Sequence, residues 1–155
     1  MDQLVTAERL STAIAHASIL YHRLVLLVAP AGMGKTNCLR AVAEQQGFRY
    51  INVNLELSRC LLDLTERQRA LQTPRLLADI VSKKGEHVVL LDNIEILFDV
   101  TLKQDPLRLL QGLSRNRTAV TAWSGAVVDR FLLYAQPDHP EYRRYPVDDL
   151  VVVSP

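Results

Sequence analysis

The chain has 155 residues, of which 48% are hydrophobic and 23% are charged. These proportions are typical of a globular protein and exclude a disordered chain, and we expect a single domain that spans residues 1–155. The 18 lysines and arginines nearly balance the 17 aspartates and glutamates, which gives a net charge of +1. Any DNA binding must therefore come from a local patch, and we expect it to be weak and strongly salt-dependent.

The cysteine and hydropathy patterns favour the cytoplasm. Cys38 and Cys60 lie far apart and outside any histidine cluster, so neither a disulfide framework nor a zinc site is expected. The longest apolar runs fall short of the roughly 20 residues that a membrane span needs. Residues 1–9 also lack the pattern of a signal peptide. We therefore expect a cytoplasmic protein without membrane contact.

The first third of the chain predicts alternating helices and strands. Residues 1–22 are expected to hold a leading helix, because apolar residues recur at spacings of four, three and four from Leu10 to Tyr21. Residues 24–28 are a continuous aliphatic run, typical of a parallel strand that is covered on both faces. The elements that follow are a turn at 29–34, a helix from Lys35 that stops at Gly47, and a strand at 50–53.

The middle of the chain continues this alternation. Residues 55–84 are helical in pieces, and Thr73-Pro74 predicts a new helix start because a cap donor precedes a proline there. A second aliphatic run ends in Asp92. The helix is expected to end at 83–85, and a further helix from Asp105-Pro106 and a strand at 118–123 follow.

Residues 124–155 are predicted to be an irregular segment followed by a last strand. Prolines and glycines interrupt the segment, so we expect only a short strand or turn at 131–135 before the strand at 150–153. The whole pattern predicts an α/β fold, an open and mainly parallel sheet of about five strands with helices on both faces.

Residues 29–36 form a candidate phosphate-binding loop. They match G-x-x-x-x-G-K-[ST] except that Ala29 replaces the first glycine. The motif follows a buried strand and begins a helix, where free backbone N–H groups and the positive helix end bind phosphate. This predicts a P-loop NTPase, and the lack of a guanine signature after Asp92 favours ATP. The residues expected to contact the nucleotide are Pro30, Ala31, Gly32, Met33, Gly34, Lys35, Thr36, Asn37 and Ser124.

The run that ends in Asp92 has the form of a Walker B strand. An aspartate at this position holds Mg²⁺ beside the phosphate loop, and we expect Thr36 and Asp92 to be the metal-binding residues. Many ATPases of this class place a glutamate next, whereas here Asn93 follows and Glu95 comes two residues later. Either Glu95 is the catalytic carboxylate, acting with Lys35, or hydrolysis is slow. The alternative for Glu95 is a solvated residue in the first turn of a helix.

Ser124 is the candidate polar group directed at the γ-phosphate, with Thr121 as the alternative. Ser124 directly follows the strand at 118–123, and its neighbour Gly125 also allows a simple turn role.

Five arginines flank this strand. Arg115 and Arg117 precede it and should lie at the amino end of the sheet, away from the nucleotide. Arg130, Arg143 and Arg144 follow it and are better placed to reach the phosphate of a neighbouring subunit, or else form a solvated face.

Residues 28–36, 90–98, 122–125 and 134–142 resemble the BrxF family, the small P-loop proteins of type 3 BREX phage-defence systems. The Asp-Asn-Ile-Glu segment at 92–95 and the His-Pro-Glu-Tyr segment at 139–142 carry most of this resemblance. It implies a bacterial cytoplasmic protein that acts beside a methyltransferase and a larger ATPase in modifying self DNA and blocking phage. The phosphate loop also resembles those of STAND and AAA+ ATPases, but 155 residues leave no room for their helical lid.

Three functions are consistent with the sequence. The first is an ATPase that binds Mg²⁺ and ATP and changes its association with itself or with other BREX proteins. The second is a nucleotide-dependent adaptor that does not hydrolyse ATP, which Asn93 favours. The third is a DNA-binding module that uses Arg115, Arg117, Arg143 and Arg144, and it requires these four residues to lie on one face.

Overall fold

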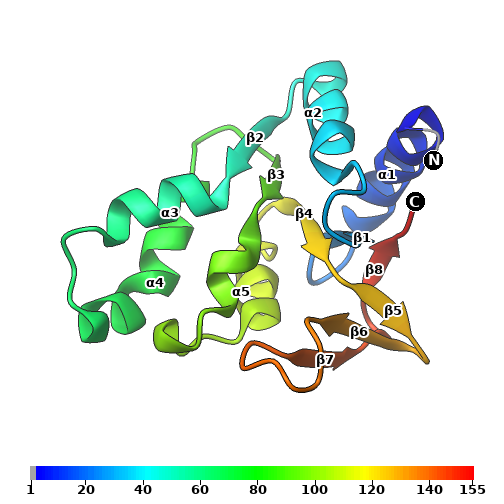
Figure 1. The fold of residues 1–155 in the computed structure, drawn as a ribbon. Coiled ribbons are helices and arrows are strands. Elements are labelled where there is room, and N and C mark those ends of the chain that lie inside the picture. Colours follow the sequence, from blue (N-terminus) through cyan, green and yellow to red (C-terminus); the bar gives the residue numbers. More distant parts are fainter. Residues whose placement is uncertain (1–2) are drawn as a thin grey trace.

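The computed structural model describes residues 3–155 and confirms an α/β fold (Figure 1). The main sheet has five parallel strands in the order β2-β3-β4-β1-β8, and a three-stranded antiparallel sheet has the order β5-β6-β7. The strands of the main sheet are β1 (Leu24–Ala29), β2 (Arg49–Asn52), β3 (Val88–Asp92), β4 (Thr118–Ser124) and β8 (Val151–Val153).

Helices cover both faces of the main sheet, as predicted. The helices are α1 (Gln3–Ala17), α2 (Lys35–Gln46), α3 (Val53–Leu61), α4 (Glu66–Val81) and α5 (Pro106–Leu113), with two short 3₁₀ helices, η1 (Ile94–Phe98) and η2 (Val100–Leu102). Along β1, Val25 and Leu27 join the core under α1 and α2, whereas Leu24 and Leu26 join the core under the other helices. No helix among residues 3–155 is long and apolar enough to cross a membrane.

The first helix is shorter than predicted. It ends at Ala17, and Tyr21, expected on its buried face, is 69% exposed. Ser18 and the residues after it form a turn that leads into β1 instead of another helical turn. Residues 1–2 of the predicted leading helix lie outside the described part of the chain. By contrast, α2 ends as predicted, because Gly47 adopts a left-handed φ of 71° and caps it.

The prediction that Thr73-Pro74 begins a helix is wrong, because Pro74 lies inside α4. The helix begins at a capping box, in which Thr65 and Gln68 each bond the other's backbone N–H. A proline inside a helix has no N–H for the carbonyl four residues earlier, here that of Ala70. The Gln104 side chain donates to this carbonyl oxygen at 2.8 Å, so the acceptor that Pro74 leaves free is satisfied.

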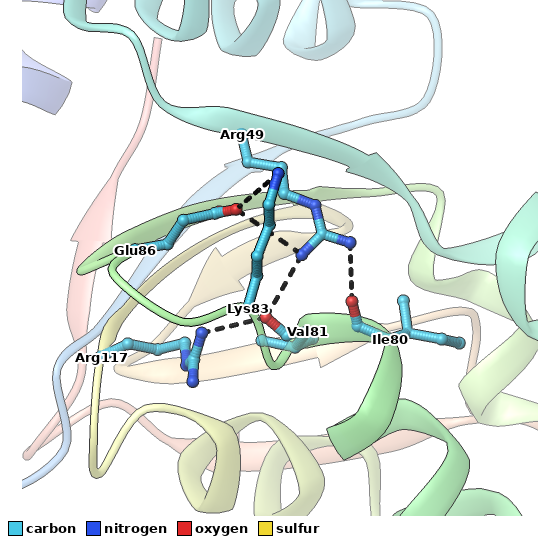
Figure 2. A network of polar contacts seen from close by, with 6 residues as sticks. All are labelled: Arg49, Ile80, Val81, Lys83, Glu86 and Arg117. Atoms are coloured by element: carbon cyan, nitrogen blue, oxygen red, sulfur yellow. Dashed lines mark hydrogen bonds and ion pairs between the residues drawn. The ribbon is translucent and has the colours of Figure 1, made fainter.

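The helix also ends earlier than predicted, at Val81 instead of at residues 83–85. Two arginines near the amino ends of β2 and β4 bind its last carbonyls (Figure 2). Arg49 at the start of β2 donates to Ile80 O at 2.8 Å, and Arg117 just before β4 donates to Val81 O at 3.0 Å. Glu86 lies 4.0 Å from Arg49 and 3.7 Å from Lys83. This network joins α4 to the amino ends of the strands, the end where we expected Arg117.

The segment at 124–155 is more regular than predicted, because it contains a second sheet. Its strands are β5 (Ala126–Val128), β6 (Phe131–Tyr134) and β7 (Arg143–Pro146). Only β6 had been expected. The turn between β5 and β6 consists of Asp129 and Arg130, with φ values of 50° and 68°. Positive φ at both central residues is typical of a tight hairpin turn, but Asp-Arg lacks the glycine that would have indicated one in the sequence.

An aromatic cluster attaches the second sheet to the first. Trp123 on β4 is fully buried and donates from Nε1 to Leu133 O at 3.0 Å. Phe98 stacks on Tyr134 with ring centroids 3.5 Å apart, and both rings meet Trp123 edge-on. The position of the second sheet beside the end of β4 therefore depends on close packing around Trp123.

We predict that Gly125→Ala destabilises the protein by about 1–3 kcal/mol through overpacking. A Cβ at this position would clash with Leu133 O, a backbone atom that cannot move without shifting β6. Urea denaturation measures the free energy of unfolding. The control is Gly112→Ala in α5, where a Cβ meets nothing within 4 Å and alanine should add roughly 0.5–1 kcal/mol. Equal effects of the two substitutions would contradict the proposed packing.

Candidate nucleotide-binding site

The candidate site lies where the parallel strands of the main sheet end. In the strand register, Ala29 pairs with Ser124, and Asn52 pairs with Asp92, so these residues lie at the same edge. A hollow of about 360 Å³ opens there. Its lining residues come from the loop after β1, the start of α2, and the ends of β3 and β4: Ala31, Gly32, Gly34, Lys35, Thr36, Asn37, Asp92, Asn93, Glu95 and Ser124.

The loop between β1 and α2 has the backbone shape that a phosphate cradle needs. Gly32 and Gly34 both adopt left-handed conformations, with φ values of 78° and 84°. Gly34 immediately precedes α2, and no side chain caps the helix there. The N–H groups at the start of this 12-residue helix are therefore not occupied by a capping side chain, and the positive end of the helix faces an incoming anion.

Lys35 is held over its own loop. Its side chain is 8% exposed, and Nζ donates to Ala29 O and Pro30 O, each at 2.9 Å. Burial lowers the pKa of the Lys35 ammonium from 10.5, and the carboxylates of Glu95 and Asp92 oppose this decrease. These two carbonyl oxygens accept hydrogen bonds from the Lys35 ammonium. Phosphate oxygens would accept the same hydrogen bonds in a nucleotide complex.

Asp92 accepts three hydrogen bonds in the site. The residue is 3% exposed, and its Oδ2 accepts from Thr36 Oγ1 and from Tyr50 OH, each at 2.6 Å. Its Oδ1 accepts from the Asn93 backbone N–H at 2.9 Å. A hydroxyl and a carboxylate that share one hollow are the hard oxygen ligands that Mg²⁺ prefers, so the two residues fit the predicted metal role.

Protein side chains alone do not build a complete metal site. Among residues 3–155, no group of three or more His, Cys, Asp or Glu side chains could hold a metal ion. Mg²⁺ at Thr36 and Asp92 would therefore take its remaining ligands from water and from the nucleotide phosphates, which is its usual arrangement in phosphate-binding enzymes.

The structure brings Glu95 and Ser124 together in the hollow. Glu95 is exposed and lies on η1, and Ser124 Oγ donates to Glu95 Oε1 at 3.3 Å. The chain does not enter an α-helix directly after Asp92. Asn93 is left-handed, with a φ of 55°, and a 3₁₀ helix follows. This turn nevertheless leaves both Glu95 and Asn93 lining the site.

Two of the predicted nucleotide contacts lie outside this hollow. Pro30 and Met33 instead line a neighbouring hollow of about 300 Å³ together with residues of β5 and the chain after β8. Because β8 and β3 lie on opposite sides of β1 in the sheet, this hollow and Asp92 lie on opposite sides of the phosphate loop. Met33 is 53% exposed.

Tyr50 bonds to Asp92 from outside the hollow, a contact that sequence reasoning missed. It lies in the middle of β2, where an aromatic residue indicates only a strand. Burial, reinforced by the hydrogen bond to Asp92, raises the pKa of the Tyr50 hydroxyl to about 12, and the Arg40 guanidinium opposes the increase. The Arg40 guanidinium lies 4.7 Å from the centroid of the Tyr50 ring.

The arginines around β4 lie in different places. Besides Arg117, Arg115 is also at the amino end, over the ring of Tyr21. Arg143 donates to Gln104 O at 2.8 Å, whereas Arg144, the next residue on β7, lies over the Phe131 ring. Adjacent residues of a strand point to opposite faces, so these two guanidinium groups do not form one patch. Arg130 is 2.9 Å from Asp148 in an exposed ion pair.

A family model matches this part of the chain. The model of the ATPase family associated with various cellular activities (AAA) covers residues 25–116, more than half of the 155 residues. The chain belongs to the AAA family. The match begins in β1 and extends beyond α5, so it includes the phosphate loop and the Walker B strand. It confirms the expected relation to AAA+ ATPases and supports nucleotide binding, with ATP and typically Mg²⁺ as the ligands of the family.

A solved structure supports the same fold. The structure of C. elegans PCH-2 is similar, with a TM-score of 0.54 and 14% sequence identity. The similarity covers 98% of this chain and 42% of PCH-2, so the chain spans less than half the length of that protein. Comparison with curated protein sequences found no match.

We predict that MgATP raises the Tm of the wild type and that Lys35→Ala loses most of this increase. Ligand at about 100 times Kd stabilises a protein by about 2.7 kcal/mol, and loss of a charged hydrogen bond costs about 1.5–3 kcal/mol of binding. Thermal unfolding with and without MgATP measures both shifts. Lys84→Ala, at an exposed lysine beyond the end of α4, is the control and should behave like the wild type. Equal shifts in all three proteins would contradict the assignment of the loop.

Proposed function

We propose that this protein binds MgATP in the hollow at the carboxyl edge of its main sheet and hydrolyses it weakly or when a partner stimulates it. The observation that carries this proposal is the convergence of Lys35, Thr36, Asp92, Glu95 and Ser124 on one hollow from three separate segments of the chain. Membership of the AAA family supports the ligand, because that family is one of ATPases.

Each residue has a distinct role in this proposal. The Lys35 ammonium exchanges its two carbonyl partners for phosphate oxygens, and the N–H groups of the loop and of α2 bind the rest of the phosphate chain. Thr36 and Asp92 would hold Mg²⁺, which supplies positive charge that neutralises the phosphates. Ser124 would donate to the γ-phosphate, and its present bond to Glu95 keeps its side chain in the hollow.

The group that activates water is Glu95 in this proposal. Asn93 occupies the position directly after Asp92, and an amide can orient a water molecule but cannot accept its proton. Glu95 is the other carboxylate in the hollow besides the metal-binding Asp92. Its exposure and its 3₁₀ position support slow turnover in the isolated protein, because an exposed base is less well fixed than a buried one.

The resemblance to the BrxF family supports a place in a bacterial BREX anti-phage defence complex in the cytoplasm. In this setting the partners are other BREX proteins, including the methyltransferase and the larger ATPase, and the nucleotide state controls their association. A nucleotide-dependent adaptor without hydrolysis is the second candidate, and Asn93 is the specific observation that favours it. Purification from cells that carry the whole defence operon, with and without ATP, tests which proteins are bound.

We predict that Glu95→Gln retains ATP binding and loses hydrolysis by on the order of 10²–10⁴-fold, because the amide cannot take a proton from water. Asn93→Glu should raise the rate, since it restores a carboxylate directly after Asp92. Phosphate release measures turnover, and the nucleotide-dependent increase in Tm measures binding. Glu44→Gln, at an exposed position on α2, is the control. If Glu95→Gln hydrolyses ATP as fast as the wild type, Glu95 has no catalytic role. If the wild type hydrolyses no ATP even with its partners present, the adaptor is favoured.

We also predict nucleotide-dependent self-association, because an exposed arginine of a second copy can cover the phosphates. Light scattering with a slowly hydrolysed ATP analogue measures the mass. Arg130→Ala should weaken the association. The matched control is Arg75→Ala, because both arginines form exposed ion pairs and their side chains are 82% and 83% exposed. If the protein stays monomeric at high concentration with the analogue, the group that covers the phosphates must come from a different protein.

A further inference from the structure

The Asp92 carboxylate has a hydrogen-bond partner that comes from outside the phosphate loop and the Walker B strand. Tyr50 lies on β2, the edge strand of the main sheet, and its hydroxyl donates to Asp92 Oδ2 at 2.6 Å. In the register of β2 and β3, Tyr50 pairs with Leu90, two residues before Asp92 on the same face of β3. The strand pairing therefore fixes the position from which Tyr50 reaches the carboxylate.

Two further contacts hold the Tyr50 side chain. The ring packs against the core under α1 and α2, and the Arg40 guanidinium lies 4.7 Å from its centroid on the α2 side. A tyrosine held in this way loses little conformational freedom when its hydroxyl forms a hydrogen bond. The bond to Asp92 is short, as expected for a hydroxyl that donates to a carboxylate.

We propose that Tyr50 is a positioning residue of the magnesium site and that it sets the rotation of the Asp92 carboxylate. The proposal rests on the proposed function, since it concerns how the chain holds Asp92 for the metal. The χ2 torsion of Asp92 rotates its carboxylate, and without hydrogen bonds this angle has a broad distribution. Thr36 and Tyr50 fix Oδ2, and the Asn93 N–H fixes Oδ1, so the carboxylate has one orientation.

Removal of the Tyr50 hydroxyl should therefore weaken the magnesium contribution to binding and leave the contacts of the phosphate loop intact. Partners that orient metal-binding side chains typically contribute 10–100-fold to metal affinity. Because Mg²⁺ keeps several water and phosphate ligands, we expect the lower end of this range. Nucleotide binding without metal depends on Lys35 and the phosphate loop. The Tyr50 hydroxyl donates to Asp92 and not to these groups.

The experiment is a titration of Mg²⁺ at a fixed ADP concentration, followed by the increase in Tm, so that hydrolysis does not enter the measurement. Tyr50→Phe keeps the ring and should raise the half-saturating Mg²⁺ concentration about tenfold, while the shift caused by ADP in EDTA stays at the wild-type value. In an Asp92→Asn background, Tyr50→Phe should change the Mg²⁺ dependence no further, because the group that Tyr50 orients is gone.

Tyr145→Phe is the matched control. It also removes a half-buried tyrosine hydroxyl that donates to a carboxylate, that of Asp105, at 2.8 Å, but from β7 instead of from the site. This variant should lose stability without a change in Mg²⁺ dependence. A Tyr50→Phe protein that behaves in the same way would overturn the proposal and leave the proposed function intact. A wild type with no Mg²⁺-dependent shift would overturn both.

Discussion

Parallel pairing of β1 and β3 with β4 is the constraint on which the site depends. The three strands end at one edge, so residues as far apart in sequence as Lys35, Asp92 and Ser124 line one hollow. Side chains from both faces of each strand must then be apolar, because helices cover both sides of the sheet. The aliphatic runs of β1 and β3 therefore fill the core, and they also bring Asp92 and the phosphate loop after Ala29 to the same place.

Helix ends are satisfied differently at the amino and carboxyl ends of the strands in the main sheet. At the amino edge, Arg49 and Arg117 satisfy the last carbonyls of α4 and hold that helix against the strands. At the carboxyl edge, the backbone groups at the start of α2 have no capping side chain. A helix end that a protein satisfies internally contributes to stability, whereas one that it leaves open is available to a ligand. Of these two helix ends, the one that the protein satisfies lies away from the candidate site, and the open one lies in it.

The sequence was sufficient for the elements with a strong local signal. The aliphatic runs predicted β1 and β3, and Gly47 predicted the end of α2. The loop motif predicted most of the loop residues that line the hollow, but Pro30 and Met33 lie outside it. Sequence-based prediction failed where contacts between residues distant in sequence determine the structure. Pro74 is tolerated inside α4 because Gln104 binds the carbonyl of Ala70, and the hairpin at Asp129 forms without a glycine. Tyr50 could not be found, because its role depends on the register of β2 against β3, which a single sequence does not reveal.

Strand length also determines how this protein can meet other molecules. The outermost strands are short: β8 and β5 have three residues each, and β2 and β7 have four, compared with seven in β4. Each edge therefore presents few unpaired backbone groups, and a short edge is a poor template for the addition of a strand from another chain. The short edges therefore favour surfaces recognised through side chains, whose identity can distinguish one partner from another, over backbone pairing, which any extended segment can satisfy.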